Sequence, residues 1–590
     1  MKLRLGSTFA ALLLTAISVA DIRYVVTPSA ATSSLAIEMH IPVRGDTISV
    51  QIPNWAPGSY RLVDHFEAVK NVAAQDEAGR VLTVDHPDAN TWTVSAAGSK
   101  SVVLRYDLSI APRGRFPSQP EQEILHYSGP STYLYVVDRK EEPCILQFRA
   151  PSDWLIAVGL DEARERNTFL ASDYDVLADN PVTLGKFLRD EYRVHGKPHI
   201  IALRGPAMHE VDRKRLIELC RNVTETQAAF FGGLPYNKYV WHFSVNDAVD
   251  GAGGLEHLTS TQMTIASGLG PRVISVLSHE FFHLWNVKRI RSKPLGPFDY
   301  LVLPKTGALW WLEGVTDYYA DVLLVRGGLQ THEQFFGEIV NNVRGVRSNP
   351  ARLEVSPYEA SYRVGEAANG RGNSNGYRVS YYNTGWVLGL VLDLEMRART
   401  GGRRSLDDVM LALWHLTRDG KPGFEEEEIR RQLVRFGGAG MGTLYDEIVM
   451  KPGELPVEAA LARVGLIMEE HEQSFLNLGL AGAPARDAKG WRVTGASGPA
   501  EGKVRQGDIV LSLAGTTLEL ATNRAIAEAF AKASGSLKPG EPVPISVRRE
   551  GQVVTEQIVP QAASRKAQRV RPEGSPASSA LREAWLKKLK

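Results

Sequence analysis

The sequence predicts a multidomain α+β protein with an N-terminal β-sandwich-like domain, an α-rich middle domain and a small β-rich C-terminal domain. Three observations support this prediction. With 590 residues, the chain is too long for one hydrophobic core. Alternating polar and apolar residues dominate its first third, whereas helical periodicity dominates the middle. Near residue 470, short apolar runs bounded by glycine return.

The composition is that of an ordinary globular protein, with 43% hydrophobic and 23% charged residues. The formal net charge of +1 gives no sign of a nucleic-acid partner. The two cysteines, Cys144 and Cys220, are too few for a disulfide scaffold. The sequence leaves open whether they pair with each other, and two small buried side chains are the simpler expectation.

Residues 1–20 have the pattern of a secretory signal peptide. Lys2 and Arg4 give a basic start, residues 9–20 are almost wholly apolar, and Ser18-Val19-Ala20 fits a cleavage site. The apolar run is short for a bilayer span, and no later stretch approaches the ~20 apolar residues that a span needs. We therefore expect cleavage near Ala20 and a periplasmic or secreted protein without an integral membrane segment.

Residues 21–190 show the two-residue alternation that is typical of half-buried strands, punctuated by Pro and Gly. We expect a β-sandwich-like domain here. The turn at 55–60, Trp-Ala-Pro-Gly-Ser-Tyr, could face a substrate, but a structural turn is the simpler interpretation. The predicted strands lie at 47–52, 91–95, 102–110 and 132–137.

Residues 191–465 carry mainly helical periodicity and are predicted to form an α-rich domain after a single strand at 239–245. The segment 346–378 is rich in Asn, Gly and Arg and is expected to be a long irregular excursion. Besides the helix described next, helices are predicted at 209–231, 308–326, 386–399 and 405–418.

The motif His-Glu-x-x-His lies at 279–283, within an apolar stretch that no Pro or Gly interrupts. Positions four apart share one face of a helix, so the imidazoles of His279 and His283 can reach one small cation. Two neutral imidazoles suit Zn²⁺, and Glu280 beside them can take a proton from a water at the metal. The motif alone leaves open a buried helix with two hydrogen-bonded histidines.

A third metal ligand is predicted at Glu313, in a second apolar helix. Zinc peptidases use three protein ligands and leave a fourth position open. Asp317 lies four residues further along and shares the helical face of Glu313, so it can accept the free N–H of a ligand histidine. The two motifs together are far more specific than either alone.

These motifs resemble those of the gluzincin metallopeptidases, the thermolysin-like clan with Glu as third ligand. The interval between His283 and Glu313 is longer than in thermolysin. The combination of His-Glu-Phe-Phe-His-Leu-Trp-Asn-Val-Lys-Arg-Ile-Arg at 279–291 with Trp-x-x-Glu-Gly-x-Thr-Asp-Tyr-Tyr at 310–319 is similar to the glycyl aminopeptidase family of that clan. That family also carries an N-terminal β domain with Trp-x-Pro-Gly-Ser-Tyr and often a C-terminal PDZ domain. The resemblance implies a thermolysin-like fold for residues 191–465.

The resemblance also implies two substrate contacts. Gly253-Gly254-Leu255-Glu256-His257 is similar to the exopeptidase motif in which Glu holds the substrate's free α-ammonium group, so Glu256, with Gly253 and Gly254, is expected to bind the N-terminus. His257 replaces the usual Asn. Tyr382 aligns with the tyrosine that donates a hydrogen bond to the oxyanion, although Thr384 replaces the usual Lys.

Residues 470–562 resemble a PDZ domain, with Gly498-Pro499-Ala500 and Gly507-Asp508-Ile509-Val510 as the matching motifs. Such domains bind peptide or protein C-termini by strand addition, and a packing module that binds no free peptide is the alternative. Residues 563–590 are rich in Lys and Arg and are expected to form a basic flexible tail.

The resemblance thus implies an exported zinc metallo-aminopeptidase with one Zn²⁺ per chain, acting on peptides with a free N-terminus and a small first residue, Gly or Ala. A zinc-activated water would attack the scissile carbonyl, with Glu280 as general base. Two alternatives stay open: a zinc endopeptidase that recruits substrates through the PDZ domain, and a catalytically silent PDZ peptide-binding protein. The physiological substrate and the oligomeric state cannot be predicted from the sequence.

Overall fold

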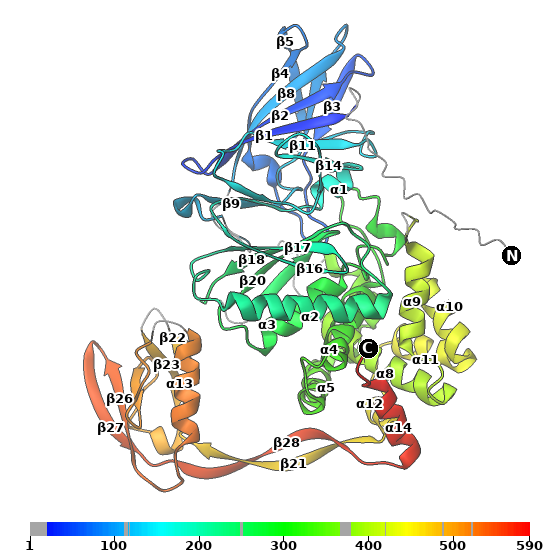
Figure 1. Ribbon diagram of the computed structural model, residues 1–590. Helices are drawn as coiled ribbons and strands as arrows, with labels where there is room; N and C mark the ends of the chain where they lie inside the picture. The colour runs from blue at the N-terminus through cyan, green and yellow to red at the C-terminus, as the bar shows by residue number, and fades with distance from the viewer. Residues whose placement is uncertain are drawn as a thin grey trace, which may run out of the picture.

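The structure, a computed structural model, describes residues 21–589 apart from 111–115, 117, 248–251, 366–378, 419–420, 486–488 and 521–522. Figure 1 shows an N-terminal β domain above a mixed catalytic domain, and a small domain held to one side by two long strands. The predicted signal peptide at 1–20 lies outside the described residues. No described helix is both long and apolar enough to cross a membrane.

The N-terminal domain is built from an eight-stranded and a four-stranded sheet, which share one hydrophobic core. The strands form at the stretches of alternating polarity, whose apolar side chains point into that core. The eight-stranded sheet has the order β13-β14-β11-β1-β2-β8-β4-β5, with β1 (Ile22–Ser29), β2 (Ser34–Pro42), β4 (Val69–Asp76), β5 (Val81–Leu82), β8 (Ser101–Ser109), β11 (Cys144–Phe148), β13 (Asp161–Glu162) and β14 (Thr168–Ala171). The four-stranded sheet has the order β10-β3-β7-β6, with β3 (Thr47–Gln51), β6 (Val84–Asp88), β7 (Thr91–Ser95) and β10 (Tyr135–Val136).

A three-stranded sheet joins this domain to the next one. It has the order β12 (Leu155–Ala157), β15 (Val182–Gly185) and β9 (Ile124–Tyr127), beside the short helix α1 (Tyr174–Ala178). His126 on β9 lies 2.8 Å from Gln262 of the catalytic domain, and Thr183 on β15 lies 2.8 Å from His242. All four side chains are buried, so this polar layer fixes how the two domains meet.

The catalytic domain begins with a five-stranded sheet, where the sequence predicted one strand. Its order is β16 (Leu188–Val194), β17 (Lys197–Arg204), β18 (Tyr239–Val245), β20 (Ser260–Ile265) and β19 (Ala252–Glu256). The segment that contains Glu256 is the antiparallel edge strand β19. Two glycines weaken its strand signal, and nearly continuous burial hides the alternation in β20, whereas β18 is the strand predicted at 239–245.

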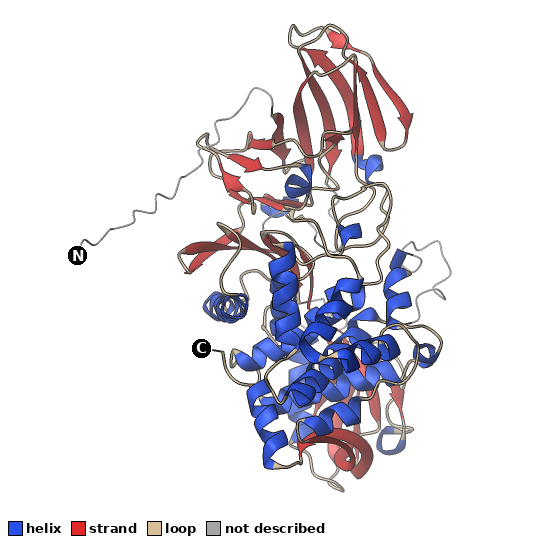
Figure 2. Ribbon diagram, turned by 90° about the vertical axis from the view of Figure 1, so that its right-hand side faces the viewer, coloured by secondary structure: helices blue, strands red, loops and turns tan. Residues whose placement is uncertain are grey.

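Helices make up the rest of the catalytic domain and pack around one large core (Figure 2). They are α2 (Arg213–Phe231), α3 (Pro271–Phe282), the π-helical turn η4 (Trp310–Val315), α4 (Thr316–Arg326), α5 (His332–Arg347), α6 (Pro357–Tyr362), α8 (Tyr381–Thr400), α9 (Leu406–Thr417), α10 (Glu427–Gly437), α11 (Ala439–Ile448) and α12 (Val457–Arg463), with short 3₁₀ turns η3 (Lys293–Leu295) and η5 (Pro350–Leu353). Two further 3₁₀ turns, η1 (His65–Ala68) and η2 (Pro120–Gln122), belong to the N-terminal domain. Part of the predicted irregular excursion, residues 366–378, lies outside the described residues.

The small C-terminal domain has its own core and one helix against its sheet. Its strands have the order β22 (Leu480–Ala485), β23 (Gly490–Ala496), β24 (Ile509–Leu513), β26 (Val543–Arg549) and β27 (Gln552–Ile558), with β25 (Thr516–Thr517) paired to β24, η8 (Gly498–Ala500) and α13 (Asn523–Gly535). Its assignment as a peptide-binding PDZ domain stays a prediction.

The expected flexible tail is wrong for residues 563–589. They belong to β28 (Gln561–Pro572), which pairs with β21 (Leu466–Asn477), and to α14 (Pro576–Trp585). Trp585 is fully buried in the catalytic core, where its indole N–H donates to Tyr318 Oη at 2.9 Å. The basic residues that suggested disorder face solvent or pair with acids, as Arg569 and Arg571 do with Glu469.

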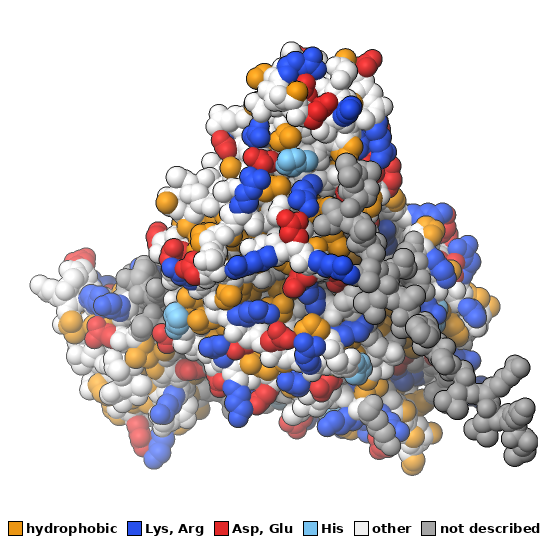
Figure 3. Space-filling view, turned by 45° about the horizontal axis from the view of Figure 1, so that its top comes forward, with side chains coloured by type: hydrophobic (Ala, Val, Ile, Leu, Met, Phe, Trp, Pro, Cys, Tyr) orange, Lys and Arg blue, Asp and Glu red, His pale blue; other side chains and the backbone are white. Residues whose placement is uncertain are grey.

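Charged side chains of both signs are mixed over the surface in Figure 3, in keeping with the near-zero net charge. Cys144 and Cys220 are both buried and free, and they lie in different domains. The two cysteines therefore pack as small apolar side chains, as expected.

Candidate metal centre and peptidase site

Helix α3 presents the His-Glu-x-x-His residues from its last turn. His279 and Glu280 are buried on it, and His283 caps its C-terminal end with 1% exposure. The two Nε2 atoms face each other at 2.8 Å. The spacing of four residues thus brings both rings to one point, as the sequence predicted.

The outer nitrogen of each ring has a fixed partner. His283 Nδ1 lies 2.9 Å from the backbone carbonyl of Asn286, and His279 Nδ1 lies 2.7 Å from Asp317 Oδ1. Because both partners accept, each Nδ1 carries a proton, and each Nε2 faces inward, where it can bind a metal once it is deprotonated. Asp317 thus makes the contact with His279 that its expected orienting role requires, and the role itself stays a prediction.

Glu313 completes the cluster from the π-helical turn η4, with 2% exposure. Its Oε2 lies 3.2 Å from His283 Nε2 and 3.7 Å from His279 Nε2. Such π-helical turns are rare inside α-helices and are frequent at functional sites. Here the wider turn comes immediately before α4 and carries the carboxylate that faces both histidines.

The donor set fits Zn²⁺. Three possible ligand atoms, the two Nε2 atoms and Glu313 Oε2, converge at distances of 2.8, 3.2 and 3.7 Å. Tetrahedral zinc with bonds of about 2.0–2.1 Å places neighbouring ligand atoms about 3.3 Å apart, close to this arrangement. Burial lowers the pKa of His283, but the charge of Glu313 outweighs it and raises that pKa to about 10, so the position attracts a cation. Two imidazoles and one carboxylate form a typical catalytic zinc site.

Helix α8 lies directly against η4 because glycines stand at the contact. A Cβ on Gly385 would lie 2.1 Å from the Trp310 carbonyl oxygen, and one on Gly314 would lie 2.4 Å from Gly385 Cα. This approach puts Tyr382, in the first turn of α8, beside the cluster, with its ring centroid 6.2 Å from that of His279. Burial and the charge of Glu313 raise the pKa of Tyr382, so its hydroxyl stays a proton donor.

We expect Gly385→Ala to destabilise the protein by about 1–3 kcal/mol and to weaken metal binding, because the new methyl group must push η4 away from α8. Chemical denaturation and metal titration measure the two effects. Gly337→Ala in α5 is the matched control, since a Cβ at Gly337 meets no atom within 4 Å. A methyl group in a helix should leave that variant as stable as the parent or more so. Equal stability of both variants would contradict the close approach.

The edge strand β19 packs onto the general-base candidate. A Cβ on Gly254 would lie 2.3 Å from the carboxyl carbon of Glu280, so only glycine leaves room for that side chain. Glu256, at the end of the same strand, is 4% exposed. Its Oε1 is buried and has no hydrogen-bond partner among the described residues. Gly254 and Glu256 are two residues apart on β19 and so share one face of the strand, the face that packs against Glu280 of α3.

The N-terminal domain also contributes to the site through the turn 55–60, which corresponds to the less favoured of the two interpretations of that turn. A Cβ on Gly58 would lie 2.6 Å from Glu256 Oε1 and 2.7 Å from Leu255, so the turn 55–60 covers Glu256 directly. Tyr60 packs within the core of the catalytic domain and is 3% exposed. Burial and the charges of Glu313 and Glu256 raise the pKa of Tyr60. The interpretation of 55–60 as a structural turn therefore described only part of its role.

His257, which stands where Asn was expected, ties the end of β19 to the N-terminal domain. Its Nδ1 lies 3.2 Å from Asp179 Oδ1, and the backbone N–H of Leu258 donates to Asp179 Oδ2 at 2.8 Å. Lys288 completes the set with an ion pair of 2.8 Å to Asp179. These buried contacts hold the strand that carries Glu256 in place.

Comparison with known proteins agrees with this geometry. Residues 23–186 match the model of the peptidase M61 N-terminal domain, and residues 272–388 match that of the M61 glycyl aminopeptidase. No curated protein matches the sequence. An aminopeptidase N family protein from Idiomarina loihiensis has a similar structure, with a TM-score of 0.74 and 22% identity over 96% of this chain and 100% of that chain.

Two further solved structures are more distant. An M1 zinc metallopeptidase variant from Deinococcus radiodurans, bound to a Tyr-Ser-Ala substrate, has a TM-score of 0.48 and 14% identity over 74% of this chain and 94% of its own. Yeast LTA4 hydrolase has a TM-score of 0.47 and 13% identity over 75% of this chain and 70% of its own. The two family matches and the three-ligand cluster lead to one conclusion: this chain is a zinc metallopeptidase, with regions similar to the N-terminal domain and to the glycyl aminopeptidase domain of peptidase family M61.

Proposed function

We propose that this protein is an exported aminopeptidase that removes small N-terminal residues, Gly or Ala, from peptides. The observation that carries the proposal is Glu256: a buried carboxylate beside the catalytic cluster, one oxygen of which has no hydrogen-bond partner among the described residues. A buried carboxylate without a partner is costly, and the α-ammonium group of a peptide is the cation that would match it. Export rests on the sequence pattern of residues 1–20.

The residues of the site divide the chemistry between them. Zn²⁺, when bound to His279, His283 and Glu313, supplies Lewis acidity. Glu280, next to His279 on α3, takes a proton from the attacking water and passes it to the leaving amine. Tyr382 donates a hydrogen bond to the oxygen on which negative charge develops.

The preference for a small first residue follows from how tightly Glu256 is covered. The turn 55–60 and Leu255 lie so close to the carboxylate that Gly58 has no room for a Cβ. A substrate held at Glu256 by its N-terminus therefore places its first side chain against Gly58 and Tyr60. The close contact of Gly58 with Glu256 favours a first side chain no larger than a hydrogen or a methyl group at this point.

N-terminal acetylation of a substrate is expected to abolish its cleavage, because the acetyl group removes the charge that Glu256 binds. Glu256→Ala should lower kcat/KM for unblocked peptides by about 100-fold, the usual effect of removing one partner of a buried charged pair. Peptide hydrolysis followed by mass spectrometry measures both, and the metal content of the variant should equal that of the parent. Equal cleavage of acetylated and free peptides would instead favour an endopeptidase.

A further inference from the structure

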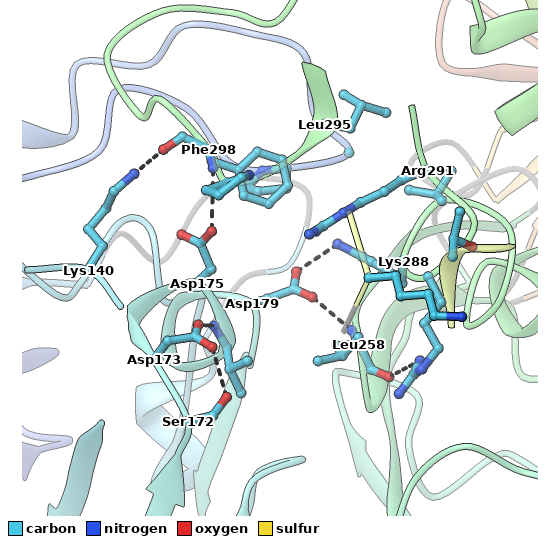
Figure 4. A pocket seen from close by; sticks show the side chains of 18 of the residues that line it. Lys140, Ser172, Asp173, Asp175, Asp179, Leu258, Lys288, Arg291, Leu295 and Phe298 are labelled. Atoms are coloured by element: carbon cyan, nitrogen blue, oxygen red, sulfur yellow. Dashed lines mark hydrogen bonds and ion pairs between the residues drawn. The ribbon is translucent and has the colours of Figure 1, made fainter. Parts of the chain in front are cut away.

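A cavity of about 750 Å³ lies between the N-terminal and catalytic domains (Figure 4). That volume is typical of sites for small molecules. The three metal ligands do not line it. Gly58 and Tyr60 do, and Gly58 also covers Glu256, so the turn 55–60 is a wall shared by the cavity and the peptidase site.

One wall of the cavity is basic. The loop after α3 contributes Lys288, Arg289 and Arg291 to it. Lys288 is neutralised by Asp179 at 2.8 Å. The Arg289 guanidinium makes hydrogen bonds of 2.8–3.0 Å to backbone carbonyls and has no carboxylate partner in the described part of the chain. Its positive charge is therefore not balanced locally.

Arg291 points into the cavity, and within the described residues it makes no side-chain hydrogen bond or ion pair (Figure 4). Its backbone is nevertheless fixed, because the N–H of Phe424 donates to the Arg291 carbonyl at 2.8 Å. Its guanidinium lies against Gly296, where a Cβ would be 2.5 Å from Nη1. The Arg291 guanidinium is thus a hydrogen-bond donor held in a fixed position, and no acceptor among the described residues occupies it.

Three of the four acidic side chains that line the cavity are already engaged. Asp175 accepts from the hydroxyl of Tyr300 at 2.8 Å, and Asp173 caps α1 by accepting from the N–H of Val176 at 2.8 Å. Asp179 accepts from Lys288 and from the backbone of Leu258. The fourth acid, Glu141, is exposed to solvent. Six Lys and Arg side chains line the cavity against these four acids, so the lining carries an excess of positive charge.

We propose that this cavity is a binding site for a carboxylate group, which Arg291 holds and whose charge Arg289 helps to balance. A guanidinium matches a carboxylate with two parallel hydrogen bonds. The carboxylate has two possible sources. One is the C-terminus of a short peptide whose other end lies at Glu256, and this source rests on the function proposed above. The other is a separate small carboxylate, which would act on Glu256 through the shared turn.

The first arm of the test compares the tripeptide Gly-Ala-Ala with its C-terminal amide as substrates. The parent should have a kcat/KM at least about tenfold higher for the free acid, since a charged hydrogen bond is lost in the amide. In Arg291→Met this ratio should fall to about one, while cleavage of the amide is unchanged. Arg403→Met is the matched control, because Arg403 is exposed, lies away from the cavity and has no partner among the described residues. It should keep the parent's ratio.

The second arm tests a separate carboxylate by titrating acetate into the reaction with the amide. If a free carboxylate binds the site, acetate should change the rate of the parent in a saturable way. Arg291→Met should then need at least about tenfold more acetate for the same change in rate. If Arg291→Met keeps both the ratio and the acetate response of the parent, the proposal is wrong. If the parent cleaves neither peptide, the affinity of each peptide is measured by calorimetry instead. Tighter binding of the free acid than of the amide, seen in the parent and not in Arg291→Met, supports the site. Equal affinity of the parent for the two peptides overturns the proposal.

Discussion

Glu280→Gln is expected to lower kcat by about 10³-fold, within the usual range for loss of a general acid–base group, and to leave zinc in place. The amide has the size of the carboxylate, so it still fits against Gly254, where there is no room for a Cβ. It cannot accept a proton from water. Hydrolysis of glycyl and alanyl chromogenic substrates measures the loss, and elemental analysis should give one zinc per chain in parent and variant.

Glu333→Gln is a matched control, because Glu333 is exposed in α5 and away from the site. It should hydrolyse the same substrates at the rate of the parent. Retained turnover in Glu280→Gln with full zinc would show that another group takes the proton. Loss of zinc from that variant would show instead that Glu280 holds the ligands in position.

Glu313→Ala should lower zinc affinity by more than about 100-fold, because even groups that only orient metal ligands contribute 10–100-fold. The substitution removes the carboxylate that faces both Nε2 atoms at 3.2 and 3.7 Å and leaves two imidazoles as ligands. Competition with a chromophoric chelator measures the affinity without reference to activity. Turnover should disappear along with the metal.

Asp317→Asn should lower zinc affinity by a smaller amount than Glu313→Ala. Asp317 touches His279 through the outer nitrogen at 2.7 Å and does not face the metal position, so its loss should cost about 10–100-fold in zinc affinity. The expected order of affinity is therefore parent, Asp317→Asn, Glu313→Ala. Equal affinity in parent and Glu313→Ala would remove Glu313 from the ligand set.

The metal cluster was predictable because it depends on local helical geometry. A spacing of four residues places His279 beside His283, and the same spacing relates Glu313 to Asp317. The helices that carry them have clear apolar periodicity. What the sequence did not show is the π-helical turn at Glu313, because such a turn depends on the packing of η4 against α8 at Gly385.

The contribution of the N-terminal domain could not be predicted in the same way. Gly58 and Tyr60 lie far from Glu256 along the chain and meet it only when two domains come together. One signal was present, since Tyr60 adopts a left-handed backbone conformation with φ of 46°, which is uncommon for a tyrosine and is often found at functional sites. That signal belongs to the structure, however, and the sequence shows only a turn.

The C-terminal helix was missed because its composition resembles that of a disordered tail. Lys and Arg are frequent in residues 563–590, and half of the helix itself is Ala and Ser, with Trp585 as its one fully buried large side chain. The partners of Trp585, Tyr318 and Arg326, are on α4, the helix that follows Glu313 in the chain. A short amphipathic helix of this kind is stabilised by its docking site and has little intrinsic signal of its own.

The arm formed by β21 and β28 has a practical consequence for anyone who wishes to work with the peptidase alone. Because the chain leaves along β21, builds the small domain and comes back along β28 to bury Trp585, a stop codon before that domain would also delete the final helix. Removing only the small domain, from within the chain, avoids this loss. Asn477 and Gln561 are cross-strand partners, so a short turn joining them would close the arm as a hairpin and keep the last segment docked on α4.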